Sequence, residues 1–184
     1  SDLASLDIAL DFLYRRSLLN EYAISFPATR SAEDSYFLTC ALLAARQIAC
    51  VDKPLYHYLM HGESLSETRN PSRYRDKIKS FDLLMQFARE NGLYEANQAE
   101  LDYIYLKKGY LLGILTYIYN EQQPQQLTLC KIYNHLLSYV PYYKANAYYH
   151  ADLKLRLLHT FVRQYPRLAF KVLPYYIHKT KMKL

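Results

Sequence analysis

The chain has 184 residues and a mass of 21.8 kDa, the size of a single domain, and 51% of its residues are hydrophobic, which is typical of a globular protein. Glycine occurs only 4 times, about a third of its usual share, which argues against a complete nucleotide-binding α/β domain with its phosphate loops and tight turns. The net charge of +6 is uneven: residues 150–184 hold eight Lys or Arg and one acid, so they carry +7 and the other residues carry −1. This distribution disfavours a nucleic-acid binder, and no nucleic-acid partner is expected.

The first 70 residues change pattern about every ten residues. Apolar periodicity predicts helices in two of these stretches, and Pro27 and Pro54 interrupt the others. In chain order the sequence predicts a helix over 7–21, a loop or short strand over 23–34, a helix over 35–46, one or two short strands over 47–61 and a polar loop over 62–72.

From Pro71 onward the sequence predicts only helices, over 72–91, 95–120, 126–139, 147–165 and 166–180. Asn91 and Gly92 form a strong stop signal for the first of them. The change in character near residue 70 predicts two units, residues 1–70 and residues 71–184. The expected fold class is mainly α, a helical bundle with a small α/β N-terminal remnant that carries one or two short strands.

Three further features bound the class of protein. Cys40, Cys50 and Cys130 form no CxxC pair and stand in apolar stretches, so we expect buried, reduced thiols. No run of 18 apolar residues occurs, so no membrane-spanning helix is predicted. The chain begins at Ser1 without a signal-peptide pattern, which we interpret as the edge of a longer protein.

Glu33 and Asp34 are the most informative acidic pair, because they end a loop and stand at a predicted helix N-terminus. Acids are common there for structural reasons, since they interact favourably with unpaired backbone N–H groups. A carboxylate at this position is also able to act as a general base if a substrate hydroxyl reaches it. The pair by itself leaves both interpretations open.

Five short motifs, taken together, narrow the choice. In order they are residues 13–18 (LYRRSL), 26–27 (FP), 33–34 (ED), 54–58 (PLYHY) and 64–66 (SLS). Their order and spacing over residues 7–66 resemble the C-terminal part of the catalytic domain of family-two nucleotide-sugar glycosyltransferases. These are bacterial enzymes of the GT-A fold that build exopolysaccharide, capsule and cell-wall glycans.

The resemblance implies that residues 1–70 are the acceptor side of such a catalytic domain. It implies that Asp34 is the general base of inverting sugar transfer and that Glu33 shapes the site. It further implies contacts with the acceptor or with the donor diphosphate for Tyr14, Arg15, Tyr58, His61 and Ser64. The partners of the full-length enzyme would be a nucleotide-sugar donor and a glycan or lipid-linked acceptor.

The sequence also departs from the family pattern. Residues 10–12 (LDF) replace Trp-Asn-Lys, Ala28-Thr29 replaces Glu-Gly, and Leu59 stands in place of Arg. No D-x-D motif occurs, and the histidines have no metal-ligand spacing, so no metal site and no cofactor are expected in this chain. The resemblance implies Mn²⁺ or Mg²⁺ in the full-length enzyme. The chain is then the C-terminal part of a larger enzyme or a degenerate relative, inactive in isolation.

The basic tail, FVRQYPRLAFKVLPYYIHKTKMKL, mixes apolar and aromatic residues with spaced Lys and Arg. It suits an interfacial helix on an anionic membrane, and a solvated C-terminal helix is the alternative. We therefore expect residues 150–184 to contact a membrane surface, in a cytoplasmic protein peripheral to the inner membrane face. The alternative function is a non-catalytic helical interaction or membrane-docking module, and residues 1–70 would lean on the helices or on a second copy in a homodimer.

Overall fold

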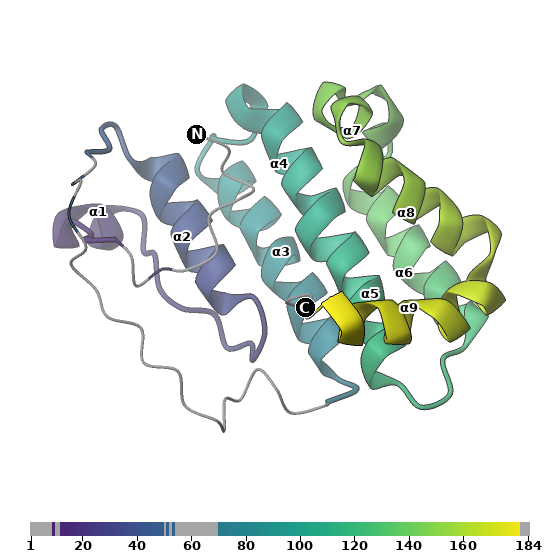
Figure 1. The fold of residues 1–184 in the computed structure, drawn as a ribbon. Helices are drawn as coiled ribbons and strands as arrows, with labels where there is room; N and C mark the ends of the chain where they lie inside the picture. Colours follow the sequence, from purple (N-terminus) through teal and green to yellow (C-terminus); the bar gives the residue numbers. More distant parts are fainter. Residues whose placement is uncertain (1–8, 10–11, 50, 52, 54–69, 181–184) are drawn as a thin grey trace.

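The computed structural model describes residues 9, 12–49, 51, 53 and 70–180, and these residues form helices joined by loops (Figure 1). The mainly α prediction is confirmed. No strand occurs among the described residues, and residues 47–49, 51 and 53 of the segment predicted as strand are irregular. A strand needs a second strand to pair with, and every described element beside this segment is a helix. Residues 54–61 of that prediction lie outside the described residues.

The N-terminal region contains two helices, α1 (Arg16–Glu21) and α2 (Glu33–Ala44). Of the helix predicted over 7–21, residues 16–21 are helical and residues 12–15 are not, and residues 7, 8, 10 and 11 lie outside the described residues. Arg15 is extended, with φ −70° and ψ 120°, and the Tyr14 hydroxyl donates to the Ala9 carbonyl at 2.8 Å. These local contacts replace the helical hydrogen bonds that residues 12–15 would otherwise make. The second helix lies two residues earlier than its predicted range of 35–46.

Helix α3 (Arg73–Glu90) ends at the predicted stop signal. Gly92 has φ +65°, a left-handed conformation that glycine adopts without steric cost. The Leu93 N–H then donates back to the Ala88 carbonyl at 2.8 Å, which closes the last turn. This ending is the pattern that Asn91-Gly92 predicted.

The central helix of the molecule runs almost without a break over the predicted 95–120. It comprises η4 (Glu95–Asn97), α4 (Gln98–Ile104), the π-helical segment η5 (Tyr105–Leu111) and α5 (Leu112–Asn120). Two glycines allow the central helix to approach α3 closely. A Cβ atom added to Gly109 would lie 2.9 Å from the Phe81 Cβ, and one added to Gly113 would lie 3.1 Å from the Ile78 Cγ1. Their lack of a side chain sets the spacing of the two helices.

The remaining elements are α6 (Gln126–Tyr139), η6 (Tyr143–Ala145), α7 (Ala147–Ala151), α8 (Leu153–Gln164) and α9 (Pro166–Thr180). The bounds of α6 and α9 are those predicted. The predicted helix over 147–165 is split at Asp152, whose carboxylate accepts the Leu155 N–H at 2.9 Å and caps α8. The split lets α7 and α8 point in different directions.

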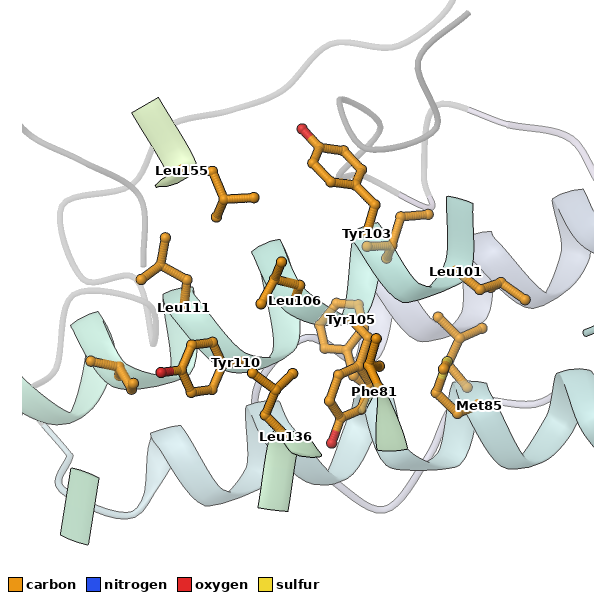
Figure 2. Packing of buried hydrophobic residues seen from close by; sticks show 14 of the residues in the cluster. Phe81, Met85, Leu101, Tyr103, Tyr105, Leu106, Tyr110, Leu111, Leu136 and Leu155 are labelled. Carbon is orange, nitrogen blue, oxygen red and sulfur yellow. The ribbon is translucent and has the colours of Figure 1, made fainter. Parts of the chain in front are cut away.

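One continuous apolar core joins these helices. Figure 2 shows its centre, where Phe81 and Met85 of α3 face the central helix and Leu136 of α6 and Leu155 of α8 reach into the same cluster. Helix α2 packs on α3 at one side of this core, and α9 lies across α5 at the other end of the chain (Figure 1). None of the described helices is long and apolar enough to cross a membrane.

The cysteines differ from one another. Cys40 is buried in α2 as predicted, and burial raises the pKa of its thiol to about 12, so the thiol stays protonated. The prediction is wrong for Cys130, which is exposed because α6 turns Leu129 and Ile132 toward the core instead. Cys50 lies outside the described residues.

Candidate functional site

Asp34 and Glu33 occupy the first turn of α2. The residue before them, Ala32, has φ +64°, and no side chain caps the amides at this helix end. The N-terminus of a helix carries a partial positive charge and unpaired N–H groups. The two acids therefore stand where negative charge is favoured, in agreement with the structural interpretation of the pair.

The environment of Asp34 also alters its acidity. Partial burial, and secondarily the charge of Glu33, raises the pKa of the Asp34 carboxyl above its ordinary value. A carboxylate with a raised pKa is a stronger proton acceptor than an exposed aspartate. This shift follows from the position of Asp34 beside Glu33 at the partly buried start of α2.

Helix α3 holds the loop that precedes α2 in place. The fully buried Ser80 hydroxyl donates to the Ser31 carbonyl at 2.9 Å and shares a hydrogen bond of 2.7 Å with the Thr29 hydroxyl. Nearby, the Arg30 N–H points at the Asp76 carboxylate at 3.4 Å. Sequence reasoning missed Ser80, because nothing within its own helix indicates a partner 49 residues away.

Tyr14 reaches α2 from the other side. The Tyr14 ring packs edge-on against the Phe37 ring at 5.1 Å between centroids. Phe26 stacks on the Phe37 ring at 4.3 Å, with the two planes 3° apart. Phe37 follows Asp34 by three residues, so it lies on the same side of α2 about one turn further along. The structure therefore brings Tyr14 to the helix that carries Asp34, in an aromatic cluster.

Of the other predicted contact residues, the structure describes only Arg15, which is not brought to Asp34 or Tyr14 by any described contact. Arg15 is exposed at the N-terminal end of α1. Tyr58, His61 and Ser64 lie outside the described residues. The described part of the site consequently comprises Asp34, Glu33 and Tyr14, with Ser80 and Phe37 as their supports.

A polar hollow lies at the N-terminal end of α3. It is lined by Pro71, Ser72, Tyr74, Arg75, Tyr117, Glu121, Gln122, Gln123, Gln125 and Thr128. Asp76, which faces the loop before α2, directly follows this lining. The hollow and the loop before Asp34 thus both contact the N-terminal end of α3. The hydroxyl, amide and aromatic groups that line the hollow are of the kinds that bind polar ligands.

The described residues contain no group of three or more His, Cys, Asp or Glu side chains that could hold a metal ion. The string nearest to a D-x-D motif lies on α4, where Glu100 accepts the Tyr148 hydroxyl at 2.6 Å and Asp102 accepts the Tyr94 hydroxyl at 2.8 Å. Both carboxylates therefore accept hydrogen bonds from tyrosine hydroxyls. The side chains described here do not fit the divalent ion that the resemblance implies for a full-length enzyme.

A hydrogen-bonded cluster around Asp82 was not predicted from the sequence. The Asp82 carboxylate of α3 accepts the Tyr105 hydroxyl at 2.6 Å and lies 3.0 Å from the His135 Nε2 of α6. Burial, followed by the Asp82 charge, raises the pKa of Tyr105, so its phenol stays protonated. The three residues join α3, η5 and α6, and their sequence separation carried no signal of this contact.

A comparison with curated proteins finds one from Bacillus subtilis (strain 168) named "Putative glycosyltransferase EpsH", which is 31% identical over 93 residues. The match covers 49% of this chain and 27% of that protein, so the chain spans about a quarter of its relative's length. No protein-family profile matches the chain, and no solved structure matches it. Over about half of its own length, the chain is related to a protein named as a glycosyltransferase.

Proposed function

We propose that this chain forms the acceptor side and helical C-terminal part of an inverting nucleotide-sugar glycosyltransferase, with Asp34 as its general base. The observation that carries the proposal is the setting of Asp34, a carboxylate of raised pKa at the N-terminus of a helix that α3 holds in place. The similarity to a protein named as a glycosyltransferase supports the same function.

The proposed chemistry is a single displacement. The Asp34 carboxylate takes the proton of an acceptor hydroxyl as that oxygen attacks the anomeric carbon of the donor sugar. The new bond forms from the acceptor oxygen to this carbon, and the bond from the carbon to the diphosphate oxygen breaks, with its electron pair leaving on the nucleoside diphosphate. The configuration at the anomeric carbon is inverted, and Asp34 is left protonated.

Glu33 and Ser80 position this base and adjust its proton affinity. The charge of Glu33 raises the pKa of its neighbour, which strengthens Asp34 as a base. Ser80 fixes the loop that leads into α2, so the carboxylate keeps one orientation toward an incoming hydroxyl. Neither residue needs to contact the substrate.

The polar hollow at the N-terminal end of α3 is the proposed binding surface for part of the acceptor glycan. Tyr74 contributes a partly exposed aromatic ring, which packs on the buried Tyr117 at 5.0 Å between centroids, and Arg75 and Gln125 contribute hydrogen-bonding groups. Sugars bind to surfaces that combine ring faces with polar groups, because they expose both C–H and O–H groups.

Donor binding belongs to other parts of the proposed enzyme. A divalent ion there would neutralise charge on the leaving diphosphate. The described side chains of this chain do not form such a site, so their contribution is limited to the acceptor and to the proton.

The test is sugar transfer by the natural full-length protein that carries this chain, with Asp34→Asn. Loss of a general base lowers the turnover by about 10²- to 10⁴-fold, and the folded state should be unchanged. Asp102→Asn is the matched control, because burial raises the pKa of Asp102 as well. Asp102 lies on α4, not on α2, and its carboxylate accepts a hydrogen bond from the Tyr94 hydroxyl.

Undiminished transfer by Asp34→Asn would remove the base assignment. An equal loss in both variants would trace the effect to folding instead. If the full-length protein transferred no sugar from any nucleotide-sugar donor, the alternative of a non-catalytic helical module would replace the proposal.

A further inference from the structure

Helix α9 has two apolar faces, and the bundle uses only one of them. Its inner face packs Ala169, Leu173 and Ile177 into the core, each 5% exposed or less. Its outer stripe consists of Leu168, Val172, Tyr175 and Tyr176, which are 45–69% exposed. Their spacing of four, three and one residues places them along one side of the helix. The fold by itself leaves this outer stripe unused.

Basic residues border the outer stripe. Arg167 and Lys171 each precede a stripe residue by one position, about 100° around the helix, and Lys179 continues the stripe three residues after Tyr176. All three side chains are exposed, and none forms an ion pair with another described residue. The helix contains no acid, and the last acid of the whole sequence is Asp152.

This combination favours one occupant over the others. A second copy that docked by the same face would bring its own Arg167 and Lys171 against these, because a two-fold interface presents the same patch from both sides. An anionic lipid surface instead attracts the cations while it takes up the apolar side chains. Tyrosines suit the boundary, since the ring is apolar and the hydroxyl stays hydrated.

We propose that the outer stripe of α9 docks this protein on an anionic lipid surface, with the helix lying parallel to that surface. The stripe runs from Leu168 to Tyr176, eight helical steps or about 12 Å along the axis, too short to cross the hydrocarbon core of a bilayer. Helix α9 lies across α5, so its outer side is free of the bundle (Figure 1). The proposal does not depend on the identity of the reaction.

The charge requirement is tested by co-sedimentation with vesicles of phosphatidylcholine, with and without phosphatidylglycerol. Arg167→Gln/Lys171→Gln/Lys179→Gln should lower the partition onto anionic vesicles by about two orders of magnitude, since each base near such a surface contributes about fivefold. Arg46→Gln/Lys79→Gln/Lys131→Gln is the matched control. It removes the same charge from exposed sites outside α9 and should lower the partition by less than tenfold.

The apolar requirement is tested with Leu168→Ser/Val172→Ser. Because both side chains are half exposed, the fold should persist, as circular dichroism can check, while binding to anionic vesicles falls by at least tenfold. Ile48→Ser/Leu127→Ser, which changes two exposed apolar residues elsewhere, is the control and should bind as the parent chain does.

The orientation is tested with a single tryptophan, because the chain contains none. Brominated lipid chains should quench the fluorescence of Val172→Trp and leave that of Leu127→Trp on α6 unchanged. Equal quenching at both positions, or no binding to anionic vesicles at low salt, would overturn the proposal. So would a dimer in size-exclusion chromatography that Leu168→Ser/Val172→Ser dissociates, since the stripe would then be covered by a second copy.

Discussion

The N-terminal region and the bundle share one apolar core and differ in how much of each region is buried in it. Helix α2 packs Leu38, Cys40 and Ala41 into the core against α3, and the hydroxyl bonds of Ser80 fix the loop that precedes it. The bundle from residue 70 to residue 180 surrounds its central helix with apolar and tyrosine side chains on every side. The helix that carries the proposed base is therefore anchored in the core, whereas the loop before it depends on a few hydrogen bonds to α3.

Within the bundle, tyrosine side chains enclose a buried histidine. Tyr110, Tyr143 and Tyr149 surround the buried His159, with ring centroids 5.3–6.0 Å from it. The Tyr149 hydroxyl pairs with the His159 Nδ1 at 3.2 Å, and the His159 Nε2 has no hydrogen-bond partner among the described atoms. A polar group of this kind is stable in the core only while it is uncharged.

The largest expected effect is on the scaffold itself. Phe81→Ala should lower the free energy of unfolding by about 3–5 kcal/mol, because the fully buried ring fills the contact between α3 and Gly109. Phe26→Ala removes a ring from the loop before α2 and should cost about 1 kcal/mol, since the stacked ring is half exposed. Denaturant unfolding measures both, and equal losses would contradict the contrast between the regions.

A second test acts on the bundle through pH. Burial, followed by the charges of Arg163 and Lys144, lowers the pKa of His159 to about 4, while the unfolded chain takes up this proton near pH 6.5. Between these values the unfolded state binds more protons, so the free energy of unfolding should fall by about 3 kcal/mol as the pH drops from 6.5 to 4. His159→Phe should flatten this dependence. An unchanged pH slope in that variant would assign the effect to other groups.

A third test acts on the N-terminal region alone. Ser80→Ala leaves the Ser31 carbonyl and the Thr29 hydroxyl buried without this partner, which should cost about 1–2 kcal/mol. Amide exchange should rise in residues 28–36 and stay slow in α5 and α6. Ser138→Ala, at an exposed site on α6, is the control. Uniformly faster exchange throughout the chain would show that the two regions unfold as one unit.

A smaller effect is expected where α7 meets α8. The Leu155 N–H, the Tyr103 hydroxyl and Lys107 overcome the effect of burial and hold the pKa of Asp152 below its ordinary value. Asp152→Ala should cost about 1 kcal/mol at neutral pH. This stabilisation is present above the unfolded pKa and is lost as the pH falls through the lower, folded one, so parent and variant should converge in acid. Asp152→Asn keeps the cap and should lose less.

The smallest effect concerns the proposed base. Glu33→Gln in the full-length protein should move the acidic limb of the transfer rate to lower pH, because the charge that helps to raise the pKa of Asp34 is gone. Glu21→Gln, an exposed acid on α1, is the control and should leave the limb in place. An unmoved limb in Glu33→Gln would separate Glu33 from the acidity of Asp34.

Much of the bundle could be predicted because its signals are local. The bounds of α6 and α9 follow from apolar periodicity and from flanking prolines, and the end of α3 follows from Asn91-Gly92. Residues 12–15 of the helix predicted over 7–21 are not helical, because the Tyr14 hydroxyl and the extended Arg15 compete with it. The break at Asp152 was missed, since a capping acid inside an apolar pattern resembles an exposed helix position.

For the candidate site, the sequence by itself determined which residues carry charge and in what order, including the acid pair at the start of α2 and the basic α9. Only the tertiary structure decided what those residues face. Burial raises the pKa of Asp34, Ser80 reaches a loop 49 residues away, and α9 presents a second apolar face outward. The physical reason is that periodicity and capping depend on neighbours along the chain, whereas desolvation and hydrogen bonding depend on neighbours in space.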